Sequence, residues 1–252
     1  MTRDPTTRFD DRVAAYVRTR PSYPREAIDA VLEGLGEPRK IVAADVGAGT
    51  GISARLLADR GVRVLAVEPN EPMRSAAEPH ENIEWRDGTA EATGLDDDSV
   101  DLVLCAQSYH WFDPPRACAE FGRILRPGGS GGGGGRLALM WNDGDESTPV
   151  AKGYYDAVRK VATDTTLSHK VVAAGPTVCA PFGEPRVLDF ANEQRLDLDG
   201  LIGRALSASY VPKSGGPHEW LIAELTRLFN EHERHGYVSL MYRTVMYLMN
   251  RD

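Results

Sequence analysis

The chain has 252 residues, 42% of them hydrophobic, so it is long enough to bury a large core and has the composition of a soluble globular protein. It contains no run of about 18 apolar residues, and its first residues, MTRDPTTRFDDR, lack the apolar segment of a secretory signal, so we expect a cytoplasmic protein that does not enter a membrane. The net charge is −8, and residues 41–150 hold the whole acidic excess, with 9 basic against 18 acidic side chains. A nucleic-acid substrate would need a basic surface, and the sequence offers none.

The three cysteines do not have the spacing of metal ligands. Cys105, Cys118 and Cys179 are an odd number spread over 75 positions, and we expect all three to be reduced thiols, with no metal site.

The N-terminal part is predicted to be helical. Two helical segments, residues 10–18 and 24–35, flank the stretch TRPSYP, whose prolines interrupt a helix.

Strands and helices then alternate along residues 41–142. The helix at residues 114–125 has Ala117, Phe121, Ile124 and Leu125 on one face. Several of the strands are nearly continuous apolar runs, which is typical of strands covered by helices on both faces. The alternation predicts an α/β protein with a doubly wound parallel sheet. The five predicted strands are IVAADV (41–46), VRVLAVE (62–68), IEWRDG (83–88), VDLVLCAQ (100–107) and RLALMWN (136–142).

The C-terminal part is less regular. Residues 150–163 are predicted to be helical, and residues 186–196 and 237–249 are predicted strands. A further helix is indicated by apolar residues that recur at helical spacing: Leu221, Leu225, Leu228 and Phe229.

A glycine-rich stretch at residues 128–135 interrupts the chain before the fifth strand. In a right-handed strand–helix–strand unit, such a loop lies at the amino ends of the strands, whereas ligands bind at the carboxyl ends. We therefore interpret it as a flexible linker, either natural or engineered, and not as part of the active site.

A second glycine motif follows the first strand, where a nucleotide would bind. Gly47, Gly49 and Gly51 form G-x-G-x-G, and Ile52 stands where the dinucleotide fingerprint G-x-G-x-x-G has its third glycine. Glu68 ends the next strand and has the position of a carboxylate that accepts both ribose hydroxyls. This pattern predicts a bound nucleoside.

With these motifs, the chain resembles the class I S-adenosylmethionine-dependent methyltransferases of the type 11 kind. ADVGAGTG and AVEPNEPMR resemble their cofactor site, and GTAE, AQSYHWFD and RILRPGG…RLALMWN match the segments that follow. YVRTRPSYP, SASYV and YRTVMYLMNR resemble the small-molecule subgroup that includes the ubiquinone/menaquinone- and trans-aconitate-type enzymes. The resemblance implies a Rossmann-like, mostly parallel seven-stranded sheet. It also implies an N-terminal helical cap (residues 1–38), a cofactor-binding core (39–149) and a C-terminal part (150–252) with an acceptor-covering helical segment and the last two strands.

The resemblance also implies which residues bind S-adenosylmethionine. Gly51 lies at the start of the helix that follows the glycine loop. Many relatives have an aspartate at the position of Thr89 that accepts a hydrogen bond from the adenine amino group. Because threonine replaces it here, Asp87 is an alternative contact for that group. Asp45, Gly47 and Gly49 face the methionine moiety, Glu68 holds the ribose, Pro69, Met73, Thr89 and Ala90 surround the adenine, Ala106 and Gln107 line the cofactor, Arg20 pairs with its carboxylate, and Tyr16 faces the sulfonium.

On the acceptor side the sequence offers two tentative catalytic residues. His110 follows the fourth strand, at the edge where site residues gather, and is a candidate general base, with packing under Trp111 as the alternative. Asn142 follows the fifth strand and either polarises the acceptor or caps the neighbouring chain.

The expected reaction is methyl transfer to an oxygen, nitrogen or carbon atom of a small molecule, which leaves S-adenosylhomocysteine. The acidic charge and the tyrosines favour an uncharged or aromatic acceptor. Three alternatives stay open: transfer or cyclisation of the aminocarboxypropyl group, an NAD-dependent oxidoreductase, and a cofactor-binding module without catalysis.

Overall fold

The computed structural model describes residues 19–128, 134–163, 181–208 and 210–251. Seven strands form one sheet in the order β3-β2-β1-β4-β5-β7-β6. The first five are parallel, and β7 runs antiparallel to both of its neighbours. The strands are β1 Val42–Val46, β2 Arg63–Val67, β3 Ile83–Arg86, β4 Leu102–Ala106, β5 Arg136–Asp145, β6 Arg186–Leu196 and β7 Val238–Asn250.

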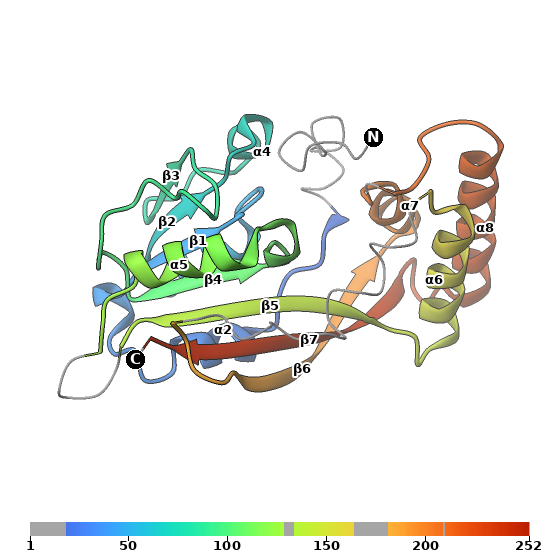
Figure 1. Cartoon of the computed structure of the whole chain (residues 1–252). Coiled ribbons are helices and arrows are strands. Elements are labelled where there is room, and N and C mark those ends of the chain that lie inside the picture. Colours follow the sequence, from blue (N-terminus) through green and yellow to red (C-terminus); the bar gives the residue numbers. More distant parts are fainter. Residues whose placement is uncertain (1–18, 129–133, 164–180, 209, 252) are drawn as a thin grey trace.

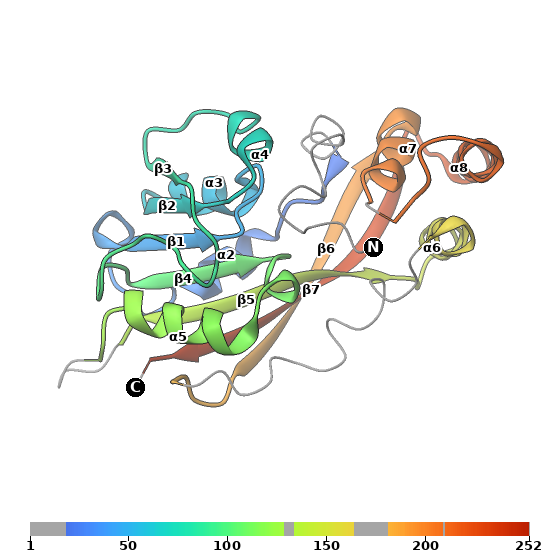
Figure 2. The ribbon, with the colours of Figure 1, turned by 45° about the horizontal axis from the view of Figure 1, so that its top comes forward.

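Helices cover both faces of this sheet (Figures 1 and 2). One face packs on α2 and α3, which bury apolar residues such as Ile28 and Leu57 against the strands. The other face packs on α5. The helices are α2 Arg25–Leu32, α3 Ile52–Ala58, α4 Glu71–Ser75, α5 Pro114–Ile124, α6 Pro149–Val161, α7 Leu198–Leu206 and α8 Gly216–His232, with short 3-10 turns η2 Pro38–Lys40 and η3 Tyr109–Trp111.

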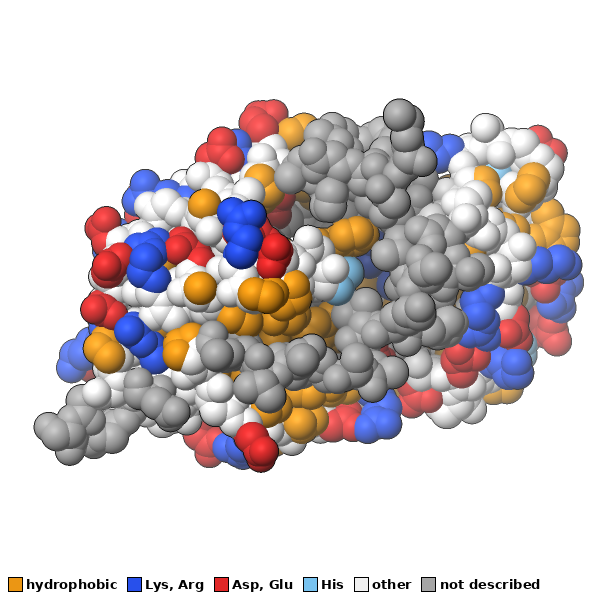
Figure 3. Space-filling model, in the orientation of Figure 1, with side chains coloured by type: hydrophobic (Ala, Val, Ile, Leu, Met, Phe, Trp, Pro, Cys, Tyr) orange, Lys and Arg blue, Asp and Glu red, His pale blue; other side chains and the backbone are white. Residues whose placement is uncertain are grey.

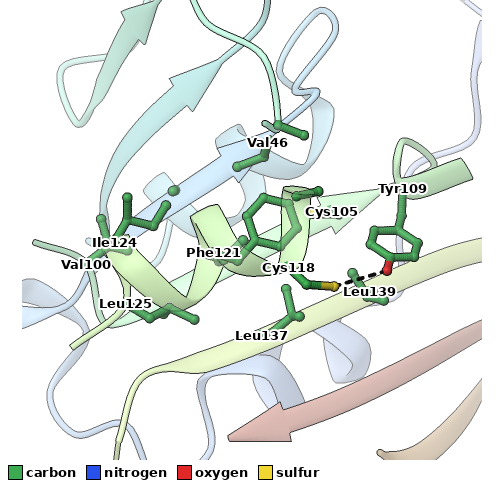
Figure 4. Packing of buried hydrophobic residues seen from close by; sticks show 14 of the residues in the cluster. Val46, Val100, Cys105, Tyr109, Cys118, Phe121, Ile124, Leu125, Leu137 and Leu139 are labelled. Atoms are coloured by element: carbon green, nitrogen blue, oxygen red, sulfur yellow. Dashed lines mark hydrogen bonds between the residues drawn. The ribbon is translucent and has the colours of Figure 1, made fainter. Parts of the chain in front are cut away.

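The core under α5 is closely packed. Phe121 is fully buried and contacts residues of β4 and β5 that include Leu137 and Leu139 (Figure 4). Tyr109, from the turn after β4, forms a 3.4 Å hydrogen bond between its hydroxyl and Cys118 Sγ. The α5 helix thereby holds the segment that follows β4 in place.

β5 and β7 are longer than the parallel strands beside them. The pairing of β4 with β5 ends at Ala106 and Met140, whereas β5 continues to Asp145 paired only with β7. This extension carries α6, α7 and α8, which form a second hydrophobic core beyond the carboxyl ends of the parallel strands (Figure 1).

The predicted α/β fold with a mostly parallel seven-stranded sheet is confirmed. The predicted strands coincide with β1 to β7 within a few residues, and the four apolar residues of the predicted late helix are buried on α8. The helix predicted at residues 24–35 is shorter, as α2, because it ends before the glycines at 34 and 36, both of which have positive φ. The helix predicted at residues 10–18 lies outside the described residues. The flanks of the glycine-rich stretch lie at the amino end of β5, as predicted, where Gly135 N donates to Arg126 O at 2.7 Å.

The prediction of three reduced thiols is wrong for Cys118. Cys118, on α5, is disulfide-bonded, whereas Cys105 on β4 is free and buried. Cys179 lies outside the described residues. The spacing of the cysteines in the sequence gives no indication of this bond. Among the described residues, no helix is long and apolar enough to cross a bilayer.

Candidate functional site

The loop between β1 and α3 requires its glycines. Gly47, Gly49 and Gly51 all have positive φ, at 68°, 59° and 82°, a region that side chains strongly disfavour. A Cβ atom on Gly47 would also lie 2.6 Å from Ser108 Cβ. The loop therefore passes directly beside the turn that follows β4, at the point in the sheet where the strand order reverses.

Glu68, at the end of β2, ties this loop to the neighbouring strand. Its Oε2 accepts a hydrogen bond from Gly49 N at 2.9 Å, and its Oε1 accepts one from Asn70 N at 2.9 Å. Burial raises the pKa of Glu68, although the two amide hydrogen bonds and the charge of Arg74 act in the opposite direction. Each carboxylate oxygen can accept a second hydrogen bond, so the side chain can still receive two hydroxyls from a ligand.

Asp45 lies underneath the loop and is fully buried. Its Oδ2 accepts a hydrogen bond from Ser53 Oγ at 2.7 Å, at the start of α3, and its Oδ1 has no hydrogen-bond partner among the described residues. Burial raises the pKa of Asp45 to about 7, and the nearby charge of Glu68 adds to this shift. Asp45 thus links the end of β1 to α3.

The turn after β4 forms the opposite wall. Gln107 has a φ of 59°, which is strained for a residue with a side chain, and its backbone N donates to Met140 O at 2.8 Å. Its Nε2 donates to Asn142 O at 3.2 Å, and Ser108 Oγ donates to Val46 O at 2.7 Å. Ala106 and Gln107 therefore lie at the carboxyl edge beside the glycine loop, where the sequence places them.

The residues predicted to surround the adenine lie at the ends of β2 and β3. Met73 is buried, and its backbone N is capped by Asn70 Oδ1 at 2.8 Å. Asp87, the alternative contact, is largely exposed and pairs with Arg74 at 3.3 Å. Three further residues were predicted to surround the adenine. Thr89 forms an isolated bridge with Ala92, Ala90 is buried, and Pro69 follows Glu68 directly.

His110, in the turn η3, is uncharged at neutral pH. Burial, reinforced by the charge of Arg20, lowers the pKa of His110 to about 4. Trp141 Nε1 donates a long hydrogen bond of 3.5 Å to His110 Nδ1, which places the imidazole proton on Nε2. In this state His110 Nε2 can donate a hydrogen bond but cannot accept a proton. Its role as general base stays a prediction.

Asn142 connects three segments that are distant in sequence. Its Nδ2 donates to Ser22 O at 3.1 Å, and its Oδ1 accepts from Asn192 Nδ2 at 3.1 Å and from Thr244 Oγ1 at 2.5 Å. These contacts hold the chain that precedes α2 across the ends of β5, β6 and β7. The geometry favours the capping alternative, and a catalytic role stays a prediction.

The two N-terminal residues of the predicted site have different outcomes. Arg20 is close enough to His110 for its charge to lower the pKa of the imidazole. Tyr16 lies outside the described residues. Arg20 therefore lies at this edge of the sheet, and its binding of a carboxylate stays a prediction.

The sequence analysis missed a group of residues on the side of α6 and α7. Tyr154 and Tyr155 of α6, Arg204 of α7 and Tyr242 of β7 lie together there. A periodic run of apolar residues after Asp197 would have revealed α7, but no local pattern would have shown that Arg204 meets these tyrosines. On the face shown in Figure 3, hydrophobic side chains gather near the middle of the surface, and a histidine is in view beside them.

Comparisons with known proteins agree on one family. Residues 44–131 match the family model described as a methyltransferase domain. An uncharacterised methyltransferase of Mycobacterium tuberculosis is 47% identical over 147 residues, which cover 57% of this chain and 56% of that protein. An uncharacterised methyltransferase-like protein of Schizosaccharomyces pombe is 35% identical over 143 residues, which cover 56% of this chain and 54% of that protein. These matches span only about half the length of either relative.

A solved structure from Anaeromyxobacter dehalogenans, provisionally described as a type II methyltransferase, has the same fold. Its TM-score is 0.65 at 24% sequence identity, and the alignment covers 92% of this chain and 97% of that one. The structure of a Bacillus subtilis protein superposes with a TM-score of 0.54 at 17% identity, covering 90% of this chain and 99% of that chain.

The close approach of the glycine loop to the β4 turn predicts unequal costs for two substitutions. Gly94→Ala introduces a Cβ at a φ of 71° with no atom within 4 Å, so it should cost about 1 kcal/mol of backbone strain. Gly47→Ala adds the contact with Ser108 and should cost about 3 kcal/mol. Urea unfolding of both variants measures the difference, and equal losses of stability would contradict the close approach.

The low pKa of His110 predicts a pH-dependent contribution to stability. The folded pKa of about 4 lies below the unfolded value of about 6.5, so the unfolded chain takes up a proton first as the pH falls. Relative to His110→Gln, the wild-type protein should therefore lose about 2 kcal/mol of stability between pH 7.5 and pH 5. Urea unfolding at both pH values gives this difference, and a pH-independent difference would show that the imidazole is not held neutral.

Proposed function

We propose that the chain, whose residues 44–131 match the methyltransferase domain family, is an S-adenosylmethionine-dependent methyltransferase that acts on a small molecule. The observation that carries the proposal is the hydrogen bond from Gly49 N to Glu68 Oε2. It joins a glycine-rich loop to a carboxylate at the point where the strand order reverses, and α/β sheets bind their ligands at such a point.

The residues at this edge fit the cofactor in shape and chemistry. At Gly47 a Cβ atom would meet Ser108 and at Gly51 it would meet Trp85, so these glycines let the loop pack closely against the residues that border the proposed site. Glu68 retains two acceptor positions for the ribose hydroxyls. The buried Met73 and Ala90 offer an apolar environment for the adenine.

The remaining cofactor contacts follow from the same arrangement. We assign the methionine moiety to the space beside Gly47, Gly49 and Gln107, and its carboxylate to Arg20. Asp45 acts beneath this space by holding the end of β1 to α3 through Ser53.

The bound cofactor would supply an activated methyl group on a positively charged sulfur, which is attacked in line by the acceptor. The chain contributes mainly position: donor and acceptor held in line are worth about 7–11 kcal/mol of the barrier, more than the roughly 10²- to 10⁴-fold from a general base. Tyr109 and Trp141 are buried and exclude water from this edge. His110, uncharged with its proton on Nε2, would orient the acceptor by donating a hydrogen bond.

Binding of S-adenosylhomocysteine tests the proposal directly. Calorimetry should show binding of S-adenosylhomocysteine and none of NAD. Glu68→Gln should weaken binding at least about tenfold, because one side-chain oxygen becomes an NH₂ group that faces a backbone N–H. Glu84→Gln is the matched control, since it makes the same change on β3 at an exposed residue paired with Arg63.

Absence of heat with S-adenosylhomocysteine, or equal affinities of the two variants, would overturn the assignment of the site. The type of transfer is decided separately by mass analysis of the spent cofactor. S-adenosylhomocysteine indicates methyl transfer, methylthioadenosine indicates use of the aminocarboxypropyl group, and an unspent cofactor after incubation with a broad set of acceptors indicates a binding module.

A further inference from the structure

The outer end of the sheet carries a cluster of one arginine and three tyrosines, which we call the Arg204 cluster: Tyr154, Tyr155, Arg204 and Tyr242. Arg204 Nε donates a 3.3 Å hydrogen bond to Tyr242 Oη, and Tyr242 Oη donates at 3.2 Å to Gln194 Oε1. The cluster lies where β5 and β7 extend beyond the parallel strands, under α6 and α7.

The guanidinium group of Arg204 is surrounded by neutral groups in the described part of the chain. Among the residues that the structure describes, no carboxylate forms an ion pair with its guanidinium group. The groups around it are tyrosine hydroxyls, and burial raises the pKa of Tyr154 and of Tyr155, so both are uncharged at neutral pH. A guanidinium group stays protonated in proteins, and a buried cation without an anion is costly. An anionic ligand group would therefore supply the negative charge that the described residues around Arg204 do not supply.

Tyr155 provides a second, independent indication of a ligand. Its hydroxyl oxygen is buried and has no hydrogen-bond partner among the described residues. The side chain lies directly over Gly144 of β5, where a Cβ atom would come within 2.4 Å of the hydroxyl. A buried hydroxyl without a partner costs free energy, and a ligand oxygen that accepts a hydrogen bond from Tyr155 would remove that cost.

The cluster lies next to the proposed cofactor site. Gly144 is two residues beyond Asn142 on β5, a distance of about 7 Å along the strand, and Asn142 O accepts the hydrogen bond from Gln107. Gly144 is paired with Tyr242 across the sheet. Arg20 also lies close enough to Tyr154 for its charge to act on the tyrosine. A small molecule that reaches from the β4 turn to Tyr155 would thus place one end beside the cofactor.

We propose that Arg204 and Tyr155 bind a carboxylate group of the methyl acceptor, and hence that the acceptor is a small carboxylic acid. This inference rests on the proposed methyltransferase function. A guanidinium group matches a carboxylate with two parallel hydrogen bonds, and the Tyr155 hydroxyl donates a further one. The site therefore favours an anionic acceptor, in place of the uncharged or aromatic one that composition alone suggests.

A labelled methyl donor identifies the class of acceptor. The whole chain is incubated with an equimolar pool of small mono-, di- and tricarboxylic acids, and separately with the pool of the corresponding primary amides. Labelled product should form at least about tenfold faster from the acids than from the amides. Faster labelling of the amide pool overturns the inference, as does labelling of neither pool by a protein that binds S-adenosylhomocysteine. Failure to bind S-adenosylhomocysteine refutes the methyltransferase function instead.

Three variants test the two residues with the acid that is labelled. Arg204→Met should lower kcat/KM by about 100-fold, Arg204→Lys should recover part of the loss because the charge remains, and Tyr155→Phe should lower kcat/KM by about tenfold. All three should bind S-adenosylhomocysteine within twofold of the wild type. The matched control is Arg227→Met, which removes an exposed arginine from α8 and should leave kcat/KM unchanged.

Tyr155→Phe keeps the test decisive if Arg204→Met fails to fold. The hydroxyl makes no hydrogen bond within the described part of the chain, so its removal should not lower the melting temperature while kcat/KM falls. A fall in melting temperature without a change in kcat/KM would show that the tyrosine is only structural. Loss of S-adenosylhomocysteine binding in Arg204→Met would assign the arginine to the cofactor. Either result overturns the inference.

Discussion

The carboxylate of Glu68 is the constraint on which the candidate site depends. Its two oxygens accept backbone hydrogen bonds from Gly49 and Asn70, so one side chain fixes the glycine loop after β1 and the turn after β2 relative to each other. Such bonds to an ionised acceptor are stronger than those between neutral groups. The loop can take this course because Gly47, Gly49 and Gly51 all have positive φ. The same carboxylate thus shapes the site and remains able to bind a ribose.

The second half of the site is built by the extension of β5 and β7 beyond the parallel strands. That extension supports α6, α7 and α8, which cover the edge of the sheet where ligands bind. Asn142 stands at the junction, because its side chain holds Ser22 from the N-terminal segment as well as Asn192 and Thr244 from β6 and β7. The parts of the chain that we propose to enclose an acceptor are therefore joined to one another at the end of β5.

The electrostatics of the two halves differ. The proposed cofactor side holds two buried carboxyl groups, Asp45 and Glu68, whose pKa values are raised by burial. The proposed acceptor side holds Arg20 and Arg204, and beside Arg20 an imidazole that is kept neutral, chiefly by burial. An anionic acceptor, bound as proposed, would place its negative charge beside Arg204. Positioning of donor and acceptor by these charges supplies most of what the proposed reaction requires.

The sequence alone predicted the positions of the strands and the buried face of α8. It also predicted that the glycine motif and Glu68 belong to one site. These features follow from the spacing of apolar residues and from turn chemistry, which are local properties of the chain. The disulfide of Cys118, the hydrogen bonds of Asn142, the neutral state of His110 and the meeting of Arg204 with the tyrosines appear only in the folded molecule. The contacts of Asn142, His110 and Arg204 join groups dozens of residues apart that come together through packing. Such contacts, and the burial that accompanies them, leave no periodic pattern in the order of residues.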